Sequence, residues 1–215
     1  MIKLSQKELV YNELFNKILS GSYNTKTRLT EDQIADEFGV SRGPVREALR
    51  DLAQDGLVDI VAHKGAFVFP FTADDVEDIF EFRKALEVLA LGYALPNISL
   101  HRLKIIRSGI FSARDSNATT EDLVELDEQL HRCITEASGK RRIIKQLEQM
   151  NRLLRPFRLL TLADREIAMH QREDHLKLID TLMVRNESEA KEVLANHIAY
   201  GKIAVLTTIV KNHAL

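Results

Sequence analysis

Residues 38–50 read Phe-Gly-Val-Ser-Arg-Gly-Pro-Val-Arg-Glu-Ala-Leu-Arg. Gly39 can adopt the left-handed conformation that a sharp turn between two helices requires. Ser41 stands where a second helix would be capped, and Arg42, Arg46 and Arg50 follow at four-residue intervals. Side chains four residues apart share one face of a helix. The stretch therefore predicts a helix-turn-helix whose second helix carries a cationic face.

The residues around this turn extend the prediction. Thr30 and Gln33 have the spacing of a capping box, so we expect the first helix to begin there. The second helix has an apolar stripe away from its arginines, formed by Val45, Ala48, Leu49 and Leu52. Arginines on the opposite face can reach guanine edges in a major groove, and the helix N-terminus at Ser41 suits a phosphate.

Two alternating stretches follow the motif. Residues 58–61 and 66–69 have strand patterns, and His63, Lys64 and Gly65 lie between them. This hairpin predicts a wing, with His63 and Lys64 at its tip. An amphipathic helix is expected before the motif, over residues 4–20, with these apolar positions: Leu9, Leu14, Ile18 and Leu19. The N-terminal part therefore reads as a winged helix-turn-helix domain.

Composition limits the class of protein. The chain has 215 residues, 45% of them hydrophobic, which is enough for two modest domains, expected at 1–70 and 71–215. No membrane span or signal peptide is expected, and a single cysteine, Cys133, fits a reducing compartment, so we expect a cytoplasmic protein. Residues 1–70 carry nine Lys and Arg against ten Asp and Glu. A domain without net positive charge predicts few phosphate contacts, and therefore a homodimer that adds the contacts of two half-sites.

The rest of the chain is expected to be helical. Six helices are predicted, with connections near Pro96, Asn117, Gly139 and Asn186, over residues 72–95, 99–116, 120–138, 140–161, 164–185 and 187–210. Pro156 should kink the fourth of them. The predicted fold class is mainly α: a winged helix-turn-helix followed by an all-α, antiparallel six-helix bundle.

Four side chains in the predicted bundle can hold a metal. Asp127 and His131 are four residues apart on one helix, and His175 and His197 lie eleven residues either side of the turn at Asn186. Antiparallel helices would place these last two side by side. One carboxylate and three imidazoles suit a divalent transition metal, zinc first, with nickel, iron or manganese as alternatives.

The N-terminal sequence resembles the GntR family of bacterial transcription regulators. The usual signature, Val-Ser-Arg-Thr-Pro-Val-Arg-Glu-Ala-Leu, stands here at residues 40–49 with Gly43 in place of threonine, so a hydroxyl contact to DNA is lost there. Gly-Leu-Val at 56–58 and Gly-Ala-Phe-Val at 65–68 match the strands of the family's wing. The resemblance implies binding to double-stranded operator DNA through these residues: Arg28, Ser41, Arg42, Gly43, Arg46, His63, Lys64 and Gly65.

Residues 72–210 resemble the FCD effector domain of the FadR subfamily, closer to its six-helix, VanR-like, metal-binding branch. That branch uses an Asp-x-x-x-His pair and one histidine on each of the last two helices, which implies a metal on Asp127, His131, His175 and His197. Arg83 matches the Arg-x-x-Leu-Glu pattern of the first helix, which implies that it binds a small carboxylate effector. By spacing alone, Arg83 could equally form a surface ion pair with Glu87.

The sequence thus predicts a homodimeric repressor or activator whose operator binding responds to a small organic acid at a metal site. Two alternatives stay open: a regulator that senses the metal itself, and, with less support, a mononuclear metal hydrolase. Arg155 and Arg158 are further candidates for the effector cavity. His170 and Cys133 are interpreted as structural, since neither shares the helix face of the ligand set.

Overall fold

The computed structural model describes residues 5–19, 22–23, 27–62, 64–68, 72–113 and 118–213. The chain divides into two compact units, which are described separately: residues 1–73 with 209–215, and residues 74–208. The first unit contains α1 (Gln6–Leu19), α2 (Glu31–Phe38) and α3 (Arg42–Gln54). Its strands are β1 (Arg28–Leu29), β2 (Val58–Val61) and β3 (Gly65–Val68).

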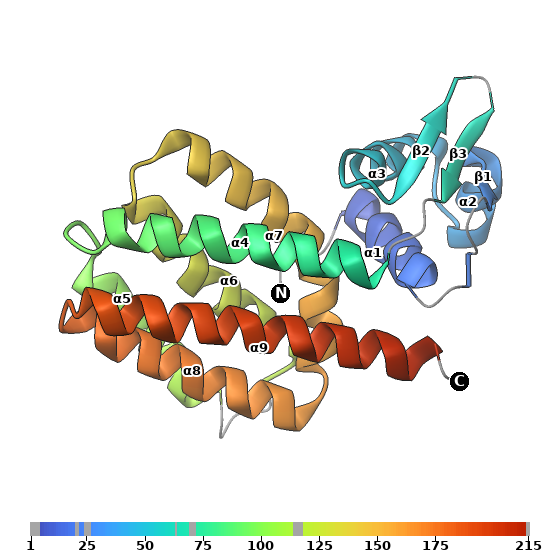
Figure 1. The fold of residues 1–215 in the computed structure, drawn as a ribbon. Coiled ribbons are helices and arrows are strands. Elements are labelled where there is room, and N and C mark those ends of the chain that lie inside the picture. Colours follow the sequence, from blue (N-terminus) through green and yellow to red (C-terminus); the bar gives the residue numbers. More distant parts are fainter. Residues whose placement is uncertain are drawn as a thin grey trace. The chain divides into compact units, whose positions relative to one another are not determined.

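The predicted helix-turn-helix is present in α2 and α3 (Figure 1). Thr30 caps α2 by accepting the backbone N–H of Gln33, and Gly39 ends the helix with φ +64°. Ser41 occupies the N-cap position of α3, but its side chain makes no capping hydrogen bond, contrary to our expectation. The predicted apolar stripe of α3 is buried in full. Its cationic residues therefore lie on the outer side of the helix.

The hairpin after α3 belongs to a small antiparallel sheet with strand order β1-β3-β2. Val61 pairs with Gly65 at the closed end of the hairpin, and Arg28 of β1 pairs with Phe67. Strand β1 was not predicted, because two residues are too few to show an alternating pattern. The predicted wing tip at His63 lies outside the described residues, as does Pro70, where a linker was expected.

Helix α1 packs on α3, and two of its predicted apolar positions, Leu14 and Ile18, belong to the buried face. Val10, Leu14, Phe15 and Ile18 are buried, whereas Leu9 is 48% exposed. The prediction that Leu9 belongs to the core is therefore wrong. Val10, Leu14 and Ile18 are each four residues apart, and Leu9 lies on the adjoining face of the same helix.

The described part of the second unit is built from the six predicted helices, the last of which runs on past residue 208: α4 (Ala73–Ala94), α5 (Leu100–Ser112), α6 (Thr120–Ala137), α7 (Arg141–Leu162), α8 (Arg165–Met183) and α9 (Glu187–His213). Their ends follow local capping signals. Thr119 and Asp122 form a complete capping box on α6, and Asp164 caps α8. The predicted fold class, a winged helix-turn-helix followed by a six-helix domain, is confirmed.

Packing within this unit leaves a polar centre among buried apolar side chains. Helix α6 contacts α5 and α7, and α8 contacts α5 and α7. Helices α4 and α9 run side by side (Figure 1), where Lys202 of α9 pairs with Glu77 and Glu81 of α4. Pro156 lies inside α7 as expected; the kink itself stays a prediction. None of the described helices combines the length and apolar character that crossing a membrane requires.

Candidate metal centre and nucleic-acid interface

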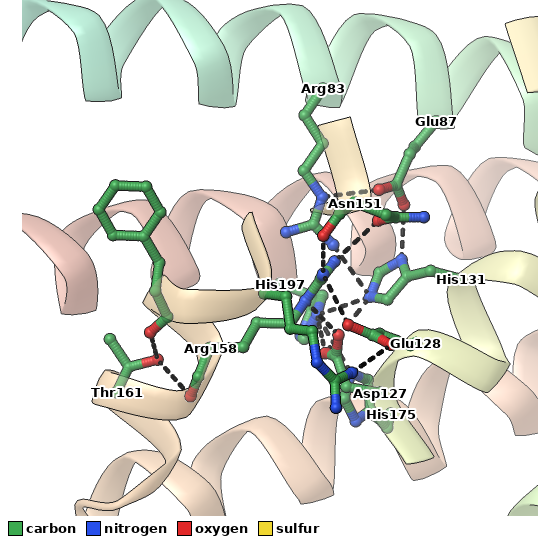
Figure 2. Close-up of polar contacts among 12 residues, drawn as sticks. Arg83, Glu87, Asp127, Glu128, His131, Asn151, Arg158, Thr161, His175 and His197 are labelled. Atoms are coloured by element: carbon green, nitrogen blue, oxygen red, sulfur yellow. Dashed lines mark hydrogen bonds and ion pairs between the residues drawn. The ribbon is translucent and has the colours of Figure 1, made fainter. Parts of the chain in front are cut away.

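The four predicted metal ligands meet at one point inside the second unit. Asp127 and His131 project from α6, His175 from α8 and His197 from α9 (Figure 2). All four side chains are buried. Each offers one ligand atom, and these four atoms lie within 4.8 Å of one another. Three helices therefore supply one compact set of donors.

The distances between these donors fit a single ion. The Nε2 atom of His197 lies 3.2 Å from the Nε2 atoms of both His131 and His175. Oδ1 of Asp127 lies 3.2 Å from His175, 3.6 Å from His131 and 4.0 Å from His197. Four ligands placed tetrahedrally at about 2.1 Å from a metal are about 3.4 Å apart. The group could hold a divalent cation with only small adjustments.

The contact of His131 with Glu87 leaves the Nε2 atom of His131 facing this centre. Nδ1 of His131 lies 2.6 Å from Oε2 of Glu87, and a carboxylate can only accept, so Nδ1 carries the proton. Burial alone would lower the pKa of His131, but Glu87 raises it, so a metal that binds at Nε2 would compete with a proton there. Glu87 is a carboxylate behind a histidine ligand, an arrangement that fixes the ring orientation in metal sites.

Charge favours the metal-binding forms of the other ligands. Burial, with help from the neighbouring His175, lowers the pKa of His197 to about 3, so its imidazole is neutral. Burial alone would raise the pKa of Asp127, but Arg158 and His131 hold that pKa well below its usual value. Asp127 therefore stays ionised. Its Oδ2 atom lies 2.6 Å from Nε of Arg158, as an ion pair without a directed hydrogen bond.

His197 has a weaker outer partner. Its buried Nδ1 makes no hydrogen bond, and the nearest carboxylate oxygen, Oδ2 of Asp174, lies 3.7 Å away. Asp174 also lies 3.7 Å from His170, which was interpreted as structural; that side chain is 48% exposed and stacks near Tyr200, with 3.8 Å between ring centroids. Asp174 and Glu87 thus stand behind two of the three histidines.

Arg83 and Glu87 form the ion pair that their spacing allowed, but in the interior rather than on the surface. Nε of Arg83 donates to Oε1 of Glu87 at 2.6 Å, and both side chains are at most 6% exposed. Nη2 of Arg83 lies 3.1 Å from Nε2 of His131 (Figure 2). Arg83 therefore touches the predicted ligand set directly, and its binding of an effector stays a prediction.

A small cavity adjoins this centre. It has a volume of about 20 Å³, and its polar lining includes Arg83, Asp127, Arg158 and His197. That volume holds about one water molecule. Arg158 is thus a cavity residue, as expected. Arg155 is not among the lining residues, because its guanidinium pairs with Glu121 and Glu128 instead.

In the first unit, the described members of the predicted DNA-contacting set lie in α3 and at its N-cap, in the sheet and, for Lys64, in the turn before β3. Arg42 and Arg46 are exposed on α3, with side-chain exposures of 67% and 54%. A groove between α3 and the hairpin is lined by residues that include Arg46, Arg50 and Gly65. A side chain at Gly43 would meet no atom within 4 Å, so packing does not require glycine there. Gly65 has φ +97°, and a Cβ would lie 2.9 Å from the carbonyl oxygen of Leu29.

The sequence reasoning missed the carboxylates that hold these groups. From the sequence, Glu87 is expected only as a possible surface partner of Arg83. The sequence does not predict that Glu31 and Asp32 on α2 pair with Arg46 and Arg42. The only available signals were the four-residue spacing of Arg83 and Glu87 and the acidic first turn of α2. Both patterns are common on solvated helices.

Comparison with known proteins gives two domain matches and full-length relatives. Residues 6–68 match the sequence model of bacterial regulatory proteins of the gntR family, and residues 78–200 match that of the FCD domain. An uncharacterized HTH-type transcriptional regulator of Bacillus subtilis is 28% identical over 190 residues, covering 87% of this chain and 85% of that protein. The Nta operon transcriptional regulator of Aminobacter aminovorans is 26% identical over 172 residues, 80% of each chain.

A solved structure agrees. The crystal structure of a GntR family transcriptional regulator from Pseudomonas syringae pv. tomato is 25% identical and has a TM-score of 0.59, with 97% of this chain and 88% of that chain covered. The relatives are named as transcriptional regulators, so the hydrolase alternative is set aside. With a gntR-type N-terminal domain and an FCD domain behind it, the chain belongs to the GntR family of bacterial regulatory proteins and is a DNA-binding transcription regulator, not an enzyme.

Proposed function

We propose that this regulator is a homodimeric repressor whose operator binding responds to a small carboxylate bound at a metal in the FCD domain. The observation that carries the proposal is the convergence of one carboxylate oxygen and three Nε2 atoms in a buried group. Asp127, His131, His175 and His197 would hold the ion, which supplies a Lewis-acidic point for an oxygen ligand. Zinc suits this donor set, and nickel, iron or manganese are alternatives.

The effector class follows from the charges next to the donors. Arg83 and Arg158 bring two buried guanidinium groups to the cavity, balanced by Glu87 and Asp127. A bound divalent cation leaves the site with excess positive charge. An anion is therefore favoured, and a carboxylate matches the fork of Arg83.

The DNA-binding half of the proposal rests on α3 and the wing. Arg42 and Arg46 are exposed on the helix that a helix-turn-helix protein places in the major groove. Gly65 lies at the edge of the protein groove next to α3. Contacts to the DNA backbone or to its grooves would come from these further residues: Arg28, Ser41, Gly43, His63 and Lys64. Two subunits on a near-palindromic operator double these contacts. Repression accords with a relative in Escherichia coli that is named as a transcriptional repressor.

One experiment tests the metal-binding and the DNA-binding parts of the proposal separately. The purified chain should contain about one equivalent of metal per subunit by elemental mass spectrometry, and the double variant His175→Ala/His197→Ala should contain none. Arg46→Ala should keep its metal and lose the difference in affinity between a duplex selected by the wild-type chain and a scrambled duplex. Metal retained by the histidine variant would show that the ligands lie elsewhere.

The alternative that the regulator senses the metal itself has one observation in its favour. The cavity of about 20 Å³ is too small for an organic acid unless its walls move. If metal alone changes operator affinity, and no member of a carboxylate panel raises the melting temperature of the loaded protein, the metal-sensing reading is correct.

A further inference from the structure

Two carboxylates in the first turn of α2 hold the arginines of α3. Oε1 of Glu31 accepts from Nε of Arg46 at 2.7 Å, and Oε2 accepts from Nη2 at 2.6 Å. Asp32 makes a single contact, 2.5 Å from its Oδ1 to Nε of Arg42. Glu31 is the better placed of the two acids, because its contact is bidentate and its side chain is 32% exposed against 60% for Asp32.

The atoms used in this contact leave the base-reading edge of Arg46 free. A guanidinium has five N–H donors, which form one edge at Nε and Nη2 and a second edge at Nη1 and Nη2. Glu31 occupies the first edge. Guanine presents O6 and N7 in the major groove, and an arginine binds this pair with two parallel hydrogen bonds. Arg46 can therefore hold Glu31 with one edge while it reads guanine with the other.

The position of the pair agrees with that role. Glu31 and Arg46 line the same groove, whose opposite wall is formed by residues of the hairpin, including Ile60 and Gly65. The pair thus lies on the side of α3 that the wing completes. The neighbouring carboxylate also lowers the attraction of this surface for phosphate, because like charges repel.

We infer that Glu31 is a specificity-determining residue: it fixes the guanidinium of Arg46 for guanine and prevents the same side chain from serving as an unspecific phosphate clamp. The inference rests on the proposed base-reading role of Arg46. Arginine has considerable rotamer freedom, and less of it remains to be lost on binding when the group is already held. This positioning therefore raises the affinity for the operator and lowers the affinity for random DNA.

The test compares full-length Glu31→Gln with wild type and with Asp36→Asn, a matched loss of one negative charge elsewhere on α2. The probes are a duplex selected in vitro by the wild-type chain and a scrambled duplex of the same composition, titrated by fluorescence anisotropy over a range of KCl concentrations. For Glu31→Gln, we expect tighter binding to the scrambled duplex, weaker binding to the selected duplex, and at least a tenfold fall in their affinity ratio. Asp36→Asn should leave the ratio unchanged.

Two further variants keep the outcomes distinct. Adding Glu31→Gln to Arg46→Ala should change the ratio no further, because the carboxylate acts through the arginine. If Arg46→Ala destroys the ratio while Glu31→Gln preserves it, the inference is overturned and the proposed function stands. If Arg46→Ala leaves the ratio unchanged, both are overturned. An unchanged melting temperature of Glu31→Gln excludes unfolding as the cause of its effect.

Discussion

Replacing Glu87 by glutamine should affect both the stability of the FCD domain and its metal affinity. Glu87 is 3% exposed and contacts two groups at 2.6 Å, Nε of Arg83 and Nδ1 of His131. Removing one partner of a buried ion pair costs about 3–5 kcal/mol. Glutamine keeps the shape and one acceptor, so we expect the low end, about 3 kcal/mol. For a protein of this size, that loss corresponds to a fall in melting temperature of roughly 6–12 °C.

The metal affinity should fall as well, because His131 loses the carboxylate that orients its ring. Loss of such an outer partner costs about 10–100-fold in affinity. The assays are thermal unfolding of the chelator-treated chain and competition of the loaded chain with a chromophoric chelator. Glu136→Gln is the matched control: Glu136 pairs with Arg102 at the surface, where both side chains are over 40% exposed. That variant should lose at most about 1 kcal/mol.

The double variant Arg83→Met/Glu87→Met separates the two effects of Glu87. Replacing both members of a buried pair by apolar groups is often neutral. The double variant should therefore recover part of the melting temperature, although the buried Nδ1–H of His131 still lacks its acceptor, while the metal affinity stays low. If Glu87→Gln melts with the wild type and binds metal equally well, the reasoning from burial and contact distance is wrong.

Three further predictions test other parts of the chain. Gly65→Ala should destabilise the wing by at least about 1 kcal/mol, because φ is +97° and the new Cβ would meet the carbonyl of Leu29 at 2.9 Å; weaker DNA binding with unchanged metal content would be the readout. Thr119→Ala should cost about 1 kcal/mol in chemical denaturation, because it removes the capping box of α6. Chelation of the bound metal should lower the melting temperature. Restoring the ion at 100 times its Kd should raise the free energy of unfolding by about 2.7 kcal/mol.

Two parts of the candidate metal centre could be predicted because helix geometry fixes them, and the resemblance to the FCD domain implied that they meet. Asp127 and His131 share a face by their four-residue spacing, and the turn at Asn186 brings His175 and His197 to 3.2 Å. Glu87 could not be placed in the same way. Large apolar side chains occur all around α4: Phe80 and Leu91 are buried, whereas Phe82 and Leu89 are about half exposed. No single apolar stripe therefore marked the inner face.

In the first unit, local sequence signals predict the bounds of the helices but not the side-chain contacts between them. The capping residues and the glycine turn gave the bounds of α2 and α3 to within a residue or two. The pairing of Glu31 with Arg46 joins residues 15 apart in sequence on two helices. Such a contact depends on how the helices cross, and no spacing rule within one helix contains that information.

On the proposed function, the small cavity has a consequence for how the signal is transmitted. Arg83 comes from α4, Arg158 from α7 and His197 from α9, so an anion that reaches all three must fit between three helices. The present volume of about 20 Å³ admits about one water molecule. A carboxylate effector can bind only if the side chains or the helices that line the cavity move. Where a helix moves, the binding free energy of the effector is linked to the position of that helix, as a regulator that responds to a ligand requires.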